Sequence, residues 1–276
     1  ASGITTVLDA VAIGDVRDGG DRLENLEKMI NAVEETQKRG LNRAEHRLHL
    51  RCELPHHTTL PLFEKLVDRE PVSLVSLMDH SPGQRQFARI EKYREYYQGK
   101  YALTNEEMAR YEEEQRQLAA QWSQPNRLSI AAMCRDRNIA LASHDDATHE
   151  HVRESHQLGS VIAEFPTTFE AAEASRTHGM NVLMGAPNIV RGGSHSGNVA
   201  ASALASLGLL DILSSDYYPA SLLDAAFRVA DDEDNRFTLP QAIRLVTKNP
   251  ASALNLHDRG EIAEGKRADL VLAHRK

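Results

Sequence analysis

Short apolar runs of strand length alternate along the chain with segments in which apolar residues recur at helical spacing. The apolar runs begin near residues 4, 47, 72, 139, 161, 181 and 211. Residues 21–39 show the helical pattern, with Leu26 and Ile30 on one face and Gly40 where a helix-terminating glycine belongs. An apolar run bounded by turn signals is typical of a fully buried strand, so the pattern predicts a parallel sheet covered by helices.

Seven strands, each followed by a helix, imply an α/β fold with right-handed crossovers between parallel strands. We predict a (β/α)8 TIM-type barrel that lacks its first strand, because the chain begins inside a strand–helix unit and without a start methionine. The alternative is an open doubly wound sheet. That fold would need a long apolar central strand and a glycine-rich first turn, and neither is clear in the sequence.

The barrel is expected to span residues 1–256, interrupted by a polar insertion at about 84–124. The insertion holds five of the seven tyrosines and a dense run of Glu, Gln and Arg, which predicts one or two polar helices. A charge run of this kind is typical of a solvated face. The other interpretation is a lid over the site. After the insertion, the sequence predicts a helix that begins at the N-cap Asn126 and ends near Arg137.

Polar side chains follow two of the predicted strands at the point where each strand ends. His144, Asp145 and Asp146 follow the run that begins at Ile139, and Asp216 follows the run that begins at Asp211. The carboxyl ends of parallel strands open onto the crevice where α/β folds bind ligands. The pattern therefore predicts a metal site or an acid–base pair. The alternative is that these side chains cap the helices that follow.

Composition narrows the functional class. A net charge of −8 and a pI near 5.9 argue against nucleic acid or a membrane surface as partner. The sequence also has no run of 18 apolar residues, so we expect no membrane span. Two cysteines form no disulfide framework, which favours a reducing cytosol and a cytoplasmic protein. A homo-oligomer stays open.

The tail and several internal segments carry a family resemblance. Gly260-Glu-Ile-Ala-Glu-Gly265-Lys-Arg-Ala-Asp-Leu-Val, after Asn249-Pro-Ala, resembles the metal-dependent amidohydrolase superfamily. The resemblance implies that residues 257–276 are part of a small β-sandwich domain. More specific similarity to the PhnM family, the triphosphate-cleaving amidohydrolases of carbon–phosphorus lyase phosphonate degradation, lies in the segments 79–87, 143–149, 164–168, 185–198 and 214–219.

This resemblance implies hydrolysis of a small nucleotide-like triphosphate, α-D-ribose 1-methylphosphonate 5-triphosphate, to the 5-phosphate and diphosphate. It implies a divalent metal, either zinc, manganese or iron, because imidazole and carboxylate ligands suit all three. His144 and Asp216 are the expected catalytic residues and metal ligands, with Asp216 also the general base. Glu53 and Glu164 are rival further ligands. Glu164 stands where the superfamily often has a histidine.

A triphosphate needs hydrogen-bond donors, and the segment 191–198 offers a guanidinium, hydroxyls, an imidazole and backbone N–H groups freed by glycine. The expected phosphate-binding residues of this segment are Arg191, Ser194, His195 and Asn198. The alternative is a glycine-rich turn. Arg85 and His80, in the loop after the third strand, are further phosphate candidates. Three other histidines are expected on the surface of one helix, namely His149, His151 and His156.

Two other functions stay open. The chain could be another amidohydrolase, a deaminase or cyclic-amide hydrolase, because a fold does not fix a substrate. It could also be a binding protein or an inactive fragment, since the expected first strand and any ligands on it are missing. The chain as given is expected to be inactive for that reason.

Overall fold

The computed structural model describes residues 2–14, 21–194 and 197–274, and its centre is one parallel sheet. Seven strands pair in chain order, from β1 at one edge to β7 at the other, and every pairing is parallel. The strands are β1 Thr6–Ile13, β2 Glu45–Glu53, β3 Val72–Met78, β4 Ala140–His144, β5 Ile162–Glu164, β6 Asn181–Gly185 and β7 Ile212–Ser214.

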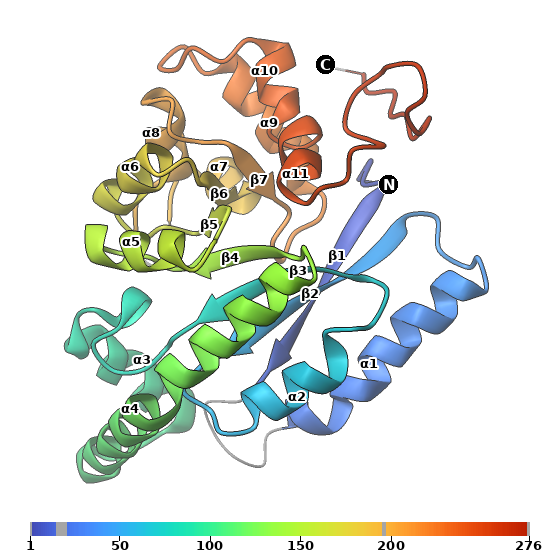
Figure 1. The fold of residues 1–276 in the computed structure, drawn as a ribbon. Helices are drawn as coiled ribbons and strands as arrows, with labels where there is room; N and C mark the ends of the chain where they lie inside the picture. Colours follow the sequence, from blue (N-terminus) through green and yellow to red (C-terminus); the bar gives the residue numbers. More distant parts are fainter. Residues whose placement is uncertain (1, 15–20, 195–196, 275–276) are drawn as a thin grey trace.

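The sheet curls into a half-barrel with the helices on its outer side (Figure 1). The helices are α1 Asp21–Lys38, α2 Thr59–Leu66, the short η1 Arg85–Phe87, α3 Ile90–Tyr101, α4 Asn105–Asp136, α5 His149–Gln157, α6 Phe169–Thr177, α7 Ala186–Arg191, α8 Ala201–Ser206, α9 Ser221–Asp231, α10 Leu239–Arg244 and α11 Lys248–Ala253. A doubly wound sheet reverses its strand order at a switch point, whereas this order never reverses. The prediction of a TIM-type barrel that lacks one strand is therefore confirmed, and the doubly wound alternative is wrong.

The outer face of the sheet forms the main apolar cores. In β2, Leu48, Leu50 and Cys52 are fully buried against Ile30 of α1 and Phe63 of α2. A second cluster packs β6 and β7 against α8, α9 and α10. Removing one such side chain from water contributes roughly 1.5–3 kcal/mol, so these outward-facing residues hold the helices on the sheet.

The inner face is apolar near the amino ends of the strands and polar near their carboxyl ends. A small inner cluster contains Leu74, Ala140, Ala142, Ile162, Leu183 and Ile212. Ser76, His144 and Glu164 each lie two residues after a member of this cluster, on the same face of the strand. All three are buried. Since side chains two apart in a strand share a face, the inner surface of the sheet becomes polar at the carboxyl end.

The insertion is a helical hairpin with a core of its own. Phe87, Tyr93, Tyr97 and Met108 are buried together, and all five tyrosines of the insertion make ring contacts there. The Phe87 ring centroid also lies 6.2 Å from that of His80, so the hairpin borders the carboxyl end of β3. The polar-helix prediction is confirmed, but four of the five tyrosines are buried or half-buried in this core, and Tyr96 is the exposed one.

The predicted start of a helix at Asn126 is wrong. Helix α4 begins after the N-cap Thr104, whose capping box with Glu107 satisfies the first backbone N–H groups, and it continues through Pro125. Asn126 is buried, and its Nδ2 donates to the backbone oxygens of Leu54 (2.8 Å) and His56 (3.0 Å). The residue ties α4 to the loop after β2 instead of capping a helix.

Residues 257–274 contain neither helix nor strand in the described part of the chain. Arg259 joins this tail to the amino ends of the first two strands, through Thr6 (3.0 Å) and Glu45 (2.8 Å). The assignment of this tail to a β-sandwich domain stays a prediction. No helix in the described ranges is both long and apolar enough to cross a membrane.

We expect Asn126→Ala to lower the free energy of unfolding by about 1–3 kcal/mol, because two buried carbonyl oxygens lose their donor. Gln117→Ala is the matched control on the same helix. Gln117 is exposed and donates only to Glu113, so its loss should stay within about 0.5 kcal/mol. Urea denaturation of both variants measures the difference, and equal midpoints would contradict the assigned role of Asn126.

Candidate metal centre

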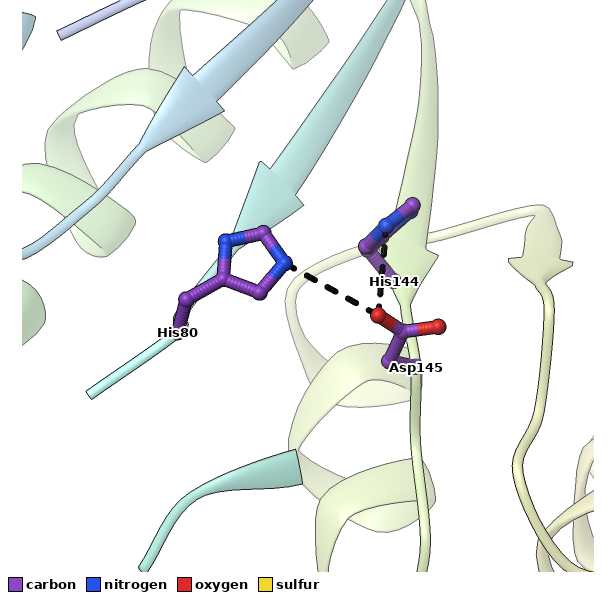
Figure 2. A group of neighbouring side chains, drawn as sticks. All are labelled: His80, His144 and Asp145. Atoms are coloured by element: carbon purple, nitrogen blue, oxygen red, sulfur yellow. Dashed lines mark ion pairs between the residues drawn. The ribbon is translucent and has the colours of Figure 1, made fainter. Parts of the chain in front are cut away.

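Three side chains converge at the carboxyl end of β3 and β4. His80, His144 and Asp145 each offer one ligand atom, and these atoms lie within 4.8 Å of one another. The Oδ2 atom of Asp145 lies 3.3 Å from Nε2 of His144 and 3.8 Å from Nε2 of His80. Figure 2 shows both imidazole rings directed at this one carboxylate oxygen.

The fold positions each of the three by its place at a strand end. His144 is the last residue of β4, and His80 follows β3 by two residues. Asp145 adopts a left-handed conformation with φ of 56°, and its N–H donates to the backbone oxygen of Glu164 (2.9 Å). This turn directs the Asp145 side chain back toward the residue that precedes it.

A carboxylate contacts Nδ1 of each imidazole, and Nε2 is the nitrogen that faces Asp145. Glu53 Oε2 lies 2.6 Å from Nδ1 of His80, and Glu164 Oε2 lies 2.7 Å from Nδ1 of His144. A carboxylate on one ring nitrogen fixes the ring orientation and leaves the other nitrogen as a metal ligand. Ser76 donates to the same Glu164 oxygen (2.8 Å), and Glu53 also accepts the backbone N–H of His80 (3.0 Å).

The carboxylates and imidazoles of this group shift one another's pKa. Burial alone would raise the pKa of Glu53 and of Glu164, but the adjacent His80 and His144 hold both values below the ordinary range. Burial would lower the pKa of His80, but Glu53 and Asp145 raise it to about 10. Three carboxylates thus surround two imidazoles. Two nitrogens and one carboxylate oxygen fit zinc, manganese or iron.

A buried ion network fixes the segments on both sides of the three candidate ligands. Arg85 pairs with Asp146 and with Glu154 (3.0 Å). Arg127 of α4 pairs with Asp79 (3.1 Å) and also with Glu154. Asp79 precedes His80, and Asp146 follows Asp145, so the network anchors both strand ends.

The structure places Asp216 at the same end of the sheet but outside this group of three. It follows β7, is exposed, and has φ of 48°. Its Oδ2 atom lies 3.4 Å from where a Cβ on Gly185 would stand. Two strands, β5 and β6, separate β7 from β4, a spacing of about 14 Å along a flat sheet that the curl shortens.

The predicted phosphate-binding segment divides into a helix end and a turn. Arg191 ends α7, and its Nη1 donates to the Tyr217 hydroxyl (3.1 Å), next to Asp216. Ser194 Oγ accepts the N–H of Asn198 (3.3 Å). His195 lies outside the described residues. Arg191 therefore lies on the same side of the site as Asp216, the predicted general base.

The structure shows where the other predicted site residues lie, and their roles stay predictions. Glu53 and Glu164 belong to the site, but they hold the imidazoles and are outside the group of three ligand atoms. His80 is one of the three candidate metal ligands, and its predicted phosphate contact stays a prediction. Arg85 is buried and held by carboxylates, so its guanidinium does not face a substrate. His151 is half-buried, and its Nδ1 accepts the N–H of Ala147 (3.3 Å), while His149 and His156 are exposed as expected.

Sequence reasoning missed the roles of Asp145, Arg51, His49 and Ser76. His49 Nε2 lies 2.5 Å from Ser76 Oγ, and burial lowers the His49 pKa to about 4. Arg51 Nη2 lies 3.1 Å from His144 Nε2. The signal was present in β2, where polar residues at 47, 49, 51 and 53 alternate with apolar ones at 48, 50 and 52. Strands of a parallel sheet are usually apolar on both faces, so this alternation marks a polar interior.

A cavity of about 1300 Å³ lies at the opposite end of the sheet. It is lined by residues at the amino ends of strands, including Ala140, Val161 and Asn181. No residue of the candidate metal centre lines it. Volume alone therefore does not identify the site in this fold.

Comparison with known proteins gives matches to one family. The amidohydrolase family matches residues 131–275. The chain is 88% identical over all 276 residues to the alpha-D-ribose 1-methylphosphonate 5-triphosphate diphosphatase of Escherichia coli (strain K12), of which it spans 73%. Solved structures with weaker similarity include an uncharacterized protein (18% identity, 52% of this chain, 40% of that chain, TM-score 0.41) and a D-hydantoinase (12% identity, 97% and 67%, TM-score 0.46).

We expect Glu164→Gln to weaken metal binding roughly 10- to 100-fold, because the amide cannot supply the charge that orients His144. Isothermal titration with zinc or manganese measures the affinity. Glu170→Gln, at an exposed position on α6, is the control and should bind metal like the parent protein. Unchanged affinity in Glu164→Gln would show that His144 is not held for a metal.

Proposed function

The chain belongs to the amidohydrolase family, and we propose that its protein hydrolyses α-D-ribose 1-methylphosphonate 5-triphosphate to the 5-phosphate and diphosphate. The observation that carries this proposal is the 88% identity with the E. coli diphosphatase along the whole chain. The geometry supports it, because imidazole and carboxylate ligands meet at the end of the barrel where such folds hold their sites.

His80, His144 and Asp145 are the residues that would hold the divalent metal, with Glu53 and Glu164 fixing the two rings. When bound, such a metal polarises a phosphoryl oxygen and lowers the pKa of water. The identity of the metal stays open among zinc, manganese and iron. The ligands it would use are already oriented by contacts with neighbouring strands.

Asp216 is the proposed general base. A water oxygen bonds to phosphorus, the anhydride bond to the diphosphate breaks, and the water proton moves to the Asp216 carboxylate. The exposed position of Asp216 allows water to reach it, and its left-handed backbone turns the residue at the end of β7. The leaving diphosphate carries away the electron pair of the broken bond.

The triphosphate is proposed to contact the segment after β6. Arg191 offers a guanidinium fork, and Ser194, His195 and Asn198 offer further donors. The contact between Arg191 and the Tyr217 hydroxyl supports this assignment, because it joins the phosphate-binding side to the Asp216 loop. Both cysteines are buried free thiols, which supports the proposal of a reducing cytosol.

In the full-length protein, Asp216→Asn should lower diphosphate release by about 10²- to 10⁴-fold, because the amide cannot accept the proton. His149→Asn is the control, since His149 is exposed on α5 and should leave turnover unchanged. A coupled assay for diphosphate measures both rates. Full activity of Asp216→Asn would exclude Asp216 as the base.

Arg191→Ala should lower kcat/KM for the triphosphate roughly 10- to 150-fold, the value of one charge-assisted phosphate contact. Metal binding should not change, because Arg191 is not among the candidate ligands. Steady-state kinetics and metal titration on the same preparation separate the two. Loss of metal in parallel with turnover would show that the segment 191–198 supports the metal centre instead.

A further inference from the structure

Arg51 is a polar residue of the barrel interior that the proposed chemistry has not yet used. It lies in β2 between His49 and Glu53, and residues two apart in a strand share a face. His49 contacts Ser76, and Glu53 contacts His80, so this face points into the site. Arg51 Nη2 itself lies 3.1 Å from Nε2 of His144, the nitrogen that faces Asp145.

The guanidinium of Arg51 lacks the neutralisation that the other buried arginines have. Arg85 and Arg127 each pair with two carboxylates. Across the described part of the chain, no carboxylate lies within the 4.0 Å ion-pair distance of Arg51, and its Nε is buried without a hydrogen-bond partner. Glu164 interacts with this charge at longer range. A partly buried cation without a directly paired counter-ion is costly, and an anion bound from outside would lower that cost.

The contact with His144 also limits where this guanidinium can be when the site is loaded. A metal held by His144 Nε2 uses the lone pair that now faces Arg51. Arg51 then has to turn from the imidazole, and all its donors become available beside the candidate ligands. A guanidinium fork matches the geometry of a phosphoryl group.

We propose that Arg51 is a substrate-binding residue that donates to the phosphoryl oxygens of the triphosphate from the β2 side. This inference rests on the proposed function and adds a second cation to the phosphate site. Arg191 lies after β6 and Arg51 lies on β2, and three strands, β3, β4 and β5, lie between β2 and β6. The two arginines thus face the carboxyl end of the half-barrel from different sides.

The test compares Arg51→Gln and Arg51→Lys in the full-length protein. Arg51→Gln should lower kcat/KM for the triphosphate roughly 10- to 150-fold. It should also weaken binding of inorganic diphosphate to the metal-loaded protein, measured by calorimetry. Arg51→Lys keeps the charge but loses the fork, so it should recover part of both. Metal affinity should not fall in either variant, because the Arg51 guanidinium competes with the metal for Nε2 of His144.

Arg47→Gln is the matched control. Arg47 lies on the same face of β2, nearer its amino end, and pairs with Glu45 (2.7 Å). This variant should keep both the turnover and the diphosphate affinity. Unchanged diphosphate binding and kcat/KM in Arg51→Gln would overturn the inference, and so would a parallel loss of metal affinity, which would mean that Arg51 positions His144. If the parent protein failed to release diphosphate, the proposed function would fail, while the calorimetric comparison would still decide the role of Arg51.

Discussion

The contact between an imidazole Nδ1 and a carboxylate from an adjacent strand is the interaction on which the site depends. It occurs twice, as Glu53 with His80 and as Glu164 with His144. The second pair exists because His144 and Glu164 are register partners of β4 and β5. A register slip of one residue would turn Glu164 into the outer helix layer, where its charge would have no partner. The polar interior therefore fixes the register as firmly as the apolar cores do.

The sequence predicts the β–α rhythm well, because buried strands are apolar runs and their order follows the chain. His144 was identifiable from sequence because it ends such a run. Asp145 was not, because its role depends on a left-handed backbone turn that an Asp-Asp pair does not specify. Glu164 was recognised as part of the site, but only the structure shows that it contacts the imidazole.

The helix boundary at Asn126 shows a different cause of error. Asparagine before an apolar stretch is a good helix start. The stronger capping box at Thr104 starts the helix earlier. The hydrogen bonds from the buried Asn126 amide to two loop carbonyls stabilise the continuous helix. Tertiary contacts thus outweighed a local signal. The candidate metal ligands and the partners of each carboxylate are likewise set by long-range contacts that local patterns do not encode.

The ion network beside the site restricts how this sequence can diverge. It joins two guanidiniums, Arg85 and Arg127, to three carboxylates, Asp79, Asp146 and Glu154, and therefore has one excess negative charge. Loss of one arginine raises that excess to two inside a poorly hydrated region, whereas loss of one acid balances it. Substitutions during evolution should therefore affect the acids of the network first. An arginine should be replaced only together with a carboxylate. Related sequences that keep both arginines but vary one acid would be evidence for this order of substitution.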